Sequence, residues 1–159
     1  MAAPSVTPDD LASLQHALSN VQELMSAKVK TLTPTSTVEE AVAIFTAGQF
    51  RHLPVTHDGR LVGIVSDRDV LRAIASDAEA SSASVAQIMT ADPAVVSPGS
   101  SLGDALREIL RHRINCLPVV DGDGQLKGIL TTTDLLRALY AVQYWLENRI
   151  AAGTDLPPA

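Results

Sequence analysis

Cysteine is nearly absent from the sequence. Cys116 is the only one among 159 residues, so no disulfide can form within the chain and no cluster of thiolates can hold a metal. The four histidines include no pair at the i, i+4 spacing that zinc enzymes use. A metal site and a disulfide framework therefore have little support.

Long apolar runs and basic segments are also missing. No stretch of about 18 consecutive apolar residues occurs, as a membrane-spanning helix needs. The N-terminus lacks the basic segment and apolar run of a secretory signal. The net charge is -6 and the 12 lysines and arginines are scattered, which argues against non-specific nucleic-acid binding. We expect a cytoplasmic protein with neither a membrane nor a nucleic acid as its main partner.

Aliphatic residues, in contrast, are abundant. Hydrophobic residues make up 46% of the chain and aromatic residues only 3%, so the core must consist mainly of Ala, Val, Leu and Ile. The length predicts one compact domain, or two very small ones that share a core.

An internal repeat organises the chain. The segment VQELMSAKVKTLTPTSTVEEA begins at Val21, and VAQIMTADPAVVSPGSSLGDA begins at Val85. The two copies align without a gap through RHLPV and NCLPV, after which one inserted residue separates THDGRLVGIVSDRDVLRA from VDGDGQLKGILTTTDLLRA. A repeat at this spacing predicts two similar units related by pseudo-twofold symmetry.

The residue pattern of each copy predicts the element order β-α-β-β-α, so the predicted fold class is α/β. Short strands at 29–32 and 94–96 lead through proline turns to helices. These helices start with TVEE and SLGD, which fit the capping-box pattern. Strands at 53–56 and 61–65 are joined by HDGR, and the second pair by DGDG; Asp-Gly between apolar runs indicates a hairpin. A second helix begins near Asp67 or Thr132.

Helical extensions are expected at both ends. TPDD at residues 7–10 predicts a helix start, and the last helix is expected to continue to Gly153. That helix carries Tyr140, Tyr144 and Trp145, which we interpret as core or interface packing. The predicted organisation is an N-terminal helical extension (1–20), repeat 1 (21–77), a linker (78–84), repeat 2 (85–140), and a C-terminal helical extension and tail (141–159).

Two interpretations compete for the motifs SDRD and TTTD. Ser66 and Asp69, like Thr131 and Asp134, could cap a helix, which is worth about 0.5–2 kcal/mol. They could also hold a ligand, because a carboxylate accepts two hydrogen bonds from a vicinal diol and a helix N-terminus offers free amides to a phosphate. Asp in place of the longer Glu, and the position where a strand opens onto a helix, favour the ligand interpretation.

Residues 21–140 resemble the tandem CBS domains, named for cystathionine beta-synthase and called a Bateman module when paired. The resemblance rests on LPV in both copies, the Asp-Gly hairpins, and Gly, two apolar residues, then Ser or Thr with Asp three positions later. It implies a stand-alone regulatory module that binds AMP, ADP, ATP or S-adenosylmethionine in two related clefts between the repeats. It also implies a homodimer, and signalling by conformational change or through a regulated protein in trans. The alternative is a ligand-free dimerisation or interaction scaffold.

The resemblance also implies the residues of each cleft. The first would place Asp69 and Ser66 at the ribose, with the base and the phosphates contacted by Ala94, Ile114, Asn115, Cys116, Arg51 and His52. The second would use Lys30, Phe50, Arg51 and His52 opposite Thr131, Thr133 and Asp134, with Asn115 and Cys116 at the phosphate end. Arg68 and Arg51 favour phosphate in the first cleft. We find no combination of base, nucleophile and acid, so we expect no enzyme, and we interpret Cys116 beside Leu117 as an inert core residue.

Overall fold

The computed structural model describes residues 20–48, 50–77 and 80–151. The predicted N-terminal helix and the C-terminal tail lie outside these residues. The elements follow in the order η1 (Val21–Glu23), α2 (Val38–Ala47), β1 (His52–His57), β2 (Arg60–Ser66), α3 (Asp67–Ser76), η2 (Ala80–Ser82), η3 (Val85–Gln87), β3 (Thr90–Ala91), α4 (Leu102–His112), β4 (Cys116–Val120), β5 (Leu126–Thr131) and α5 (Thr132–Ala151).

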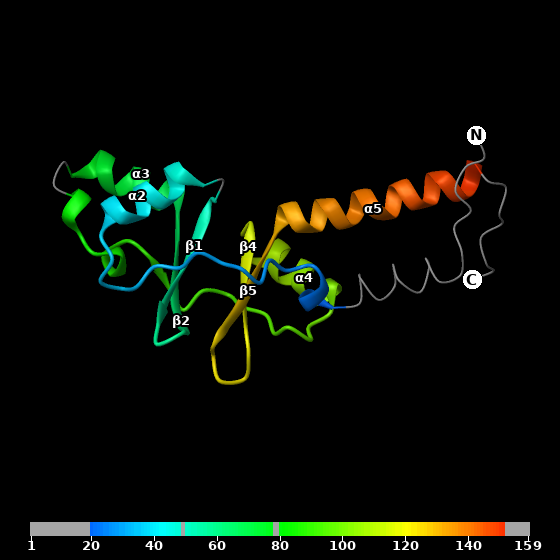
Figure 1. Ribbon diagram of the computed structural model, residues 1–159, viewed down its shortest axis with the longest axis horizontal. Helices are drawn as coiled ribbons and strands as arrows, with labels where there is room; N and C mark the ends of the chain where they lie inside the picture. Colours follow the sequence, from blue (N-terminus) through cyan, green and yellow to red (C-terminus); the bar gives the residue numbers. More distant parts are fainter. Residues whose placement is uncertain (1–19, 49, 78–79, 152–159) are drawn as a thin grey trace.

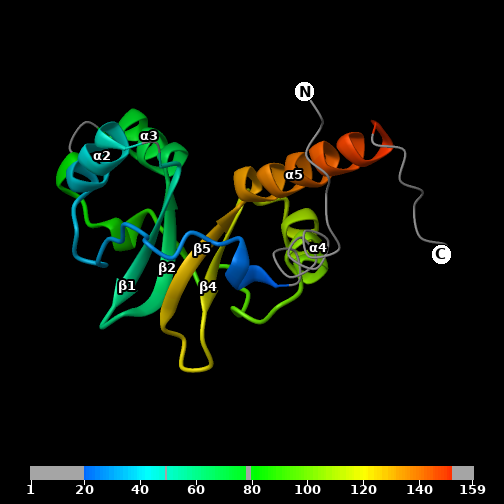
Figure 2. The ribbon, with the colours of Figure 1, turned by 45° about the vertical axis from the view of Figure 1, so that its right-hand side comes forward.

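Two antiparallel hairpins form the centre of the fold, as the sequence predicted. They lie side by side, with α2 and α3 beside the β1–β2 hairpin and α4 and α5 beside the β4–β5 hairpin (Figures 1 and 2). Val55 pairs with Gly63 in the first hairpin, and Val119 pairs with Gly128 in the second. The register is therefore the same in both copies, as pseudo-twofold symmetry requires.

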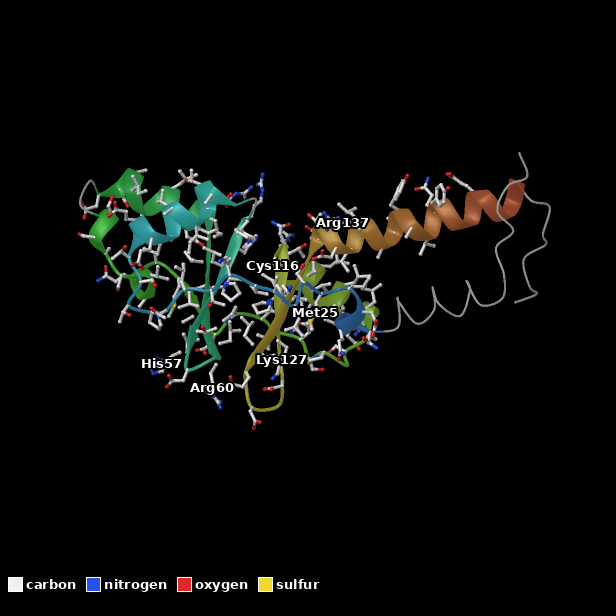
Figure 3. All side chains as sticks on the ribbon, in the orientation of Figure 1. Met25, His57, Arg60, Cys116, Lys127 and Arg137 are labelled. Carbon is white, nitrogen blue, oxygen red and sulfur yellow. The ribbon has the colours of Figure 1, made fainter. Side chains whose placement is uncertain are left out.

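The hairpins contact each other at their tips. The amide of Leu61 donates to the carbonyl of Gly124 at 3.0 Å, and the amide of Leu126 donates to the carbonyl of Gly59 at 3.0 Å. Figure 3 shows His57 and Arg60 at the tip of the first hairpin and Lys127 on β5, away from Cys116 at the start of β4. The tips are thus joined, and the opposite ends of the strands carry the starts of α3 and α5.

The two copies also exchange their first segments. The amide of Val21 donates to the carbonyl of Ser100 at 2.9 Å, so the start of repeat 1 packs on repeat 2. Reciprocally, the amide of Val85 donates to the carbonyl of Ser36 at 2.7 Å, so the start of repeat 2 packs on repeat 1. Each aliphatic core therefore includes one fully buried valine from the other copy. Each hydrophobic core therefore contains residues of both sequence repeats. The predicted repeat boundaries stay a prediction.

The exchanged segments explain the glycine of each repeated motif. A Cβ on Gly63 would lie 2.5 Å from the sulfur of Met89, and a Cβ on Gly128 would lie 2.7 Å from the sulfur of Met25. The backbone carbonyls of Thr90 and Ser26 would lie only 3.0 and 2.9 Å away from those Cβ atoms. A side chain has no room there, so glycine allows the crossing segment to approach the strand.

The predicted first strands, 29–32 and 94–96, are wrong. Each segment is reduced to a single parallel bridge, Leu32 with Val55 and Val96 with Val119. The cause is the exchange of segments. Ser26 pairs with repeat 2 before the chain reaches repeat 1 at Leu32, and Thr90 pairs with repeat 1 before the chain reaches repeat 2 at Val96. Little length is left for a continuous strand before the proline turns.

Helix α5 extends away from the two hairpins (Figures 1 and 2). It begins at Thr132 as predicted and is described to Ala151. Tyr140 and Tyr144 are 69% and 58% exposed, so a core position for them is wrong. Their rings lie 6.4 Å apart between centroids. Within the described ranges, no helix combines the length and apolar character needed to cross a bilayer.

Candidate functional site

A cavity of about 920 Å³ lies between the two repeats. Its wall includes the starts of α3 and α5, the start of β4, the segment after β3 and the end of α4. Every residue predicted for the first cleft lines this cavity: Arg51, His52, Ser66, Arg68, Asp69, Ala94, Ile114, Asn115 and Cys116. The residues predicted from the sequence for this cleft come from both repeats, and the fold places them around one cavity.

The residues predicted for the second cleft are divided. Thr133 lines the same cavity as the first set, together with the shared Arg51, His52, Asn115 and Cys116. The cavity lining does not include Lys30, Phe50, Thr131 or Asp134. These four residues therefore stay a prediction for a second cleft.

The capping interpretation of both motifs is confirmed. Asp69 Oδ2 accepts from the amide of Ser66 at 2.9 Å, and Ser66 Oγ accepts from the amide of Asp69 at 3.2 Å. In the second copy, Asp134 Oδ2 accepts from the amide of Thr131 at 2.8 Å. Both carboxylates reach back to the cap amide, so Asp in place of Glu is no argument against a capping box. A ligand role for these residues would have to coexist with their capping role.

The free amides expected at the start of α3 are not available. The amide of Asp67 donates to the carbonyl of Arg51 at 3.1 Å, and the amide of Arg68 donates to Asp67 Oδ1 at 2.8 Å. The third amide, of Asp69, is capped by Ser66. The first turn of α3 therefore offers its dipole to a ligand, but its amides already have partners.

The Asp69 carboxylate keeps part of its capacity to accept hydrogen bonds. Oδ2 accepts from Ser66 Oγ at 2.6 Å as well as from the cap amide, while Oδ1 accepts from the guanidinium of Arg72 at 3.3 Å. A carboxylate has about four lone-pair sites, so Oδ1 can accept a further donor. The side chain of Asp69 is 23% exposed, against 11% for Asp134. Of the two aspartates, Asp69 is the more accessible to a ligand.

His52 is a neutral hydrogen-bonding group at this site near pH 7. Burial lowers the pKa of its imidazole below the usual 6.5. Asp67 and Asp69 oppose this shift, while the positive charges of Arg51 and Arg68 add to it. The imidazole can therefore donate or accept a hydrogen bond, but it does not supply a positive charge for phosphate.

Cys116 forms part of the wall and is chemically inert there. Its side chain is buried, and burial raises the pKa of the thiol to about 12. The thiol stays protonated at neutral pH, and a protonated thiol is a poor nucleophile. Its interpretation as a core residue is confirmed, and it can still contact a ligand through its neutral surface.

Five ionisable residues on the cavity wall were not predicted as part of a ligand site: Asp67, Asp92, Glu108, His112 and Arg113. Glu108 and His112 lie one turn apart on α4, with His112 Nε2 3.2 Å from Glu108 Oε2. Asp92 and Arg113 have positive φ angles of 48° and 54°, which are uncommon for residues other than glycine. The i, i+4 spacing of Glu108 and His112, and the position of Arg113 beside Ile114, were the available signals.

The sequence of the chain is similar to those of known proteins. A model of the CBS domain matches residues 21–76 and 85–141. The CBS domain-containing protein YhcV of Bacillus subtilis is 30% identical over 118 residues, which are 74% of this chain and 84% of YhcV. A homoserine O-acetyltransferase of Methanocorpusculum labreanum is 33% identical over 116 residues, 72% of this chain, yet the chain spans only 23% of that enzyme.

A solved structure also resembles the chain over most of its length. It is CBSX2 from Arabidopsis thaliana, determined in complex with AMP. The TM-score is 0.72 and the sequence identity 32%, over 79% of this chain and 98% of CBSX2.

Proposed function

The chain belongs to the CBS domain family, and from this premise we propose that it is a regulatory module that binds an adenosyl ligand in the cavity beside Asp69. The observation that carries the proposal is the composition of the cavity wall. Ser66 and Asp69 from one repeat face the same space as Ala94 and residues 114–116 from the other. A ligand in this space would contact both repeats at once.

Each part of an adenosyl ligand has a suitable partner in the cavity. Oδ1 of Asp69 can accept a hydrogen bond from a ribose hydroxyl. Ala94 and Ile114 offer apolar surface to the base, and Arg51 and Arg68 carry permanent positive charge for a phosphate. The complex of CBSX2 with AMP supports the same ligand class for this chain.

Regulation would follow from the position of the ligand between the repeats. A ligand shifts a conformational equilibrium only by the difference in its affinity for the two states. Because the ligand would contact both repeats, its affinity would depend on how they are arranged. The arrangement could then be transmitted to a regulated protein in trans.

We also propose that a second copy of the chain covers the exposed apolar side chains of α3 and α5. Leu71 on α3 and Leu136 on α5 occupy corresponding positions in the two repeats and are 67% and 63% exposed. Apolar surface of this kind is commonly buried in assembly. This surface is what favours the alternative function, a ligand-free dimerisation scaffold. The cytoplasmic location expected from the sequence stays a prediction.

Isothermal titration calorimetry with AMP, ADP, ATP and S-adenosylmethionine tests the proposal. The informative pair of variants is Asp69→Asn and Asp134→Asn, because both aspartates cap a helix at nearly the same distances and only Asp69 lines the cavity. We expect Asp69→Asn to weaken binding of the tightest ligand roughly tenfold, which is about 1.4 kcal/mol. Asp134→Asn should leave binding in this cavity unchanged, because Asp134 does not line it.

Two results would contradict the proposal. If millimolar concentrations of all four ligands neither bind nor raise the unfolding temperature, the scaffold function is favoured instead. If Asp69→Asn binds the ligand as well as the wild type, the ligand does not occupy this cavity in the proposed way.

A further inference from the structure

The cavity wall carries charges of both signs. The positive groups are the guanidiniums of Arg51, Arg68 and Arg113. The negative groups are the carboxylates of Asp67, Asp69, Asp92 and Glu108. Burial lowers the pKa of the His52 imidazole, so it adds little positive charge. His112 Nε2 lies 3.2 Å from Glu108 Oε2, so these two residues are counted as a pair and set aside. The wall therefore lacks the excess of positive charge that a chain of phosphates needs.

Asp67 stands where a phosphate would meet the start of α3. It is the first residue of the helix, and its Oδ1 accepts from the amide of Arg68 at 2.8 Å. Phosphates bind helix N-termini through such amides and through the helix dipole. Here a carboxylate of the protein already uses the amide and adds a negative charge at the same place.

Residues Arg51 and Arg68 can still neutralise one phosphate group. Both line the cavity next to Asp67, and guanidiniums stay charged at every relevant pH. A monophosphate carries about two negative charges near pH 7, which two guanidiniums balance. A second or third phosphate would add negative charge to a wall that already carries these carboxylates, and like charges at short range repel.

From these charges we infer that the cavity selects its adenosyl ligand by charge, accepting a monophosphate and disfavouring di- and triphosphates, and that Asp67 sets this limit. The inference rests on the proposed function, since it concerns the same cavity and the same class of ligand. At the corresponding positions α5 begins with the neutral pair Thr132 and Thr133, so the repeated helix start does not itself require the charge of Asp67.

Calorimetry in magnesium-free buffer with AMP, ADP and ATP tests the inference on the wild type, Asp67→Asn and Asp67→Thr. Asparagine keeps an oxygen that can accept from the amide of Arg68, and threonine reproduces the start of α5. Asp58→Asn is the matched control, because Asp58 lies in a hairpin turn outside the cavity with a side chain that is 89% exposed. Unfolding temperatures without ligand show whether each variant is folded.

We expect the wild type to bind AMP roughly tenfold more tightly than ATP, with ADP between them. Both Asp67 variants should lower the ratio of the ATP to the AMP dissociation constant by about threefold or more, mainly by tighter binding of ATP. Asp58→Asn should keep the ratio of the wild type.

The outcomes separate this inference from the function on which it rests. If AMP and ATP bind the wild type equally well, or if folded Asp67 variants keep the ratio of the wild type, charge selection by Asp67 is wrong while the adenosyl site stands. If neither nucleotide binds the wild type, the proposed function fails and the inference fails with it.

Discussion

The starts of α3 and α5 share one capping geometry and differ in the side chains that they carry. In both, the carboxylate of the third helical residue accepts from the cap amide, at 2.9 Å in α3 and 2.8 Å in α5. The first helical amide donates to the residue just before the preceding hairpin, to the carbonyl of Arg51 at 3.1 Å or of Asn115 at 3.0 Å. The geometry of the backbone and cap is therefore common to both copies.

The two helix starts differ in the residues between the cap and the aspartate. Helix α3 has the charged pair Asp67 and Arg68, and α5 has Thr132 and Thr133. Asp69 also lines the cavity, whereas Asp134 does not. The comparison indicates that the shared motif fixes the start of the helix, while the variable residues inside it determine what a ligand meets.

The largest effects are expected where the two copies cross. Gly63→Ala and Gly128→Ala should each destabilise the fold by about 1–3 kcal/mol, because the new Cβ would overlap a methionine sulfur and press on a backbone carbonyl. Gly99→Ala is the control, since its Cβ would have no neighbour within 4 Å. Urea unfolding measures all three. Losses for Gly63→Ala and Gly128→Ala no larger than for Gly99→Ala would contradict the described crossing.

Loss of the cap hydroxyl should have a smaller effect that is similar in both copies. Ser66→Ala and Thr131→Ala should each cost about 0.5–2 kcal/mol of unfolding free energy. Their effect on AMP binding should differ, because only Ser66 lines the cavity. Thermal unfolding and calorimetry on the same two variants check both parts. Equal weakening of AMP binding by both substitutions would show that the two caps are equivalent toward the ligand.

The smallest effect concerns His52. Its folded-state pKa is lowered, so the unfolded chain binds a proton more readily, and the folded state loses stability as pH falls below about 6.5. The drop in unfolding temperature between pH 7.5 and 5.5 should therefore be smaller in His52→Gln than in the wild type. His57→Gln controls for the loss of an exposed imidazole. An unchanged drop in His52→Gln would exclude His52 as a source of the pH dependence.

The sequence predicted the local structure and much of the cavity, for an identifiable reason. Asp-Gly turns, alternating apolar segments and capping boxes are signals carried by neighbouring residues. Both hairpins and the starts of α3 and α5 could therefore be placed to within a residue or two. The repeat then related the two copies, and the family resemblance related Asp69 to Ala94 and residues 114–116 across them.

What the sequence did not predict depends on contacts between distant segments. Alignment of the repeats shows that Met25 and Met89 correspond, but not that each lies over the glycine of the other copy. The reach of Asp69 to the cap amide depends on side-chain geometry. Glu108 and His112 follow the ordinary pattern of a surface helix, and only the fold places them on the cavity wall.

A crystal structure of the chain with AMP would show directly whether the nucleotide binds between the two repeats. We expect AMP in the cavity, with a ribose hydroxyl on Asp69 Oδ1, the base against Ala94 and Ile114, and the phosphate beside Arg51 and Arg68. AMP bound at Asp134 alone, or bound outside the cavity, would contradict this expectation.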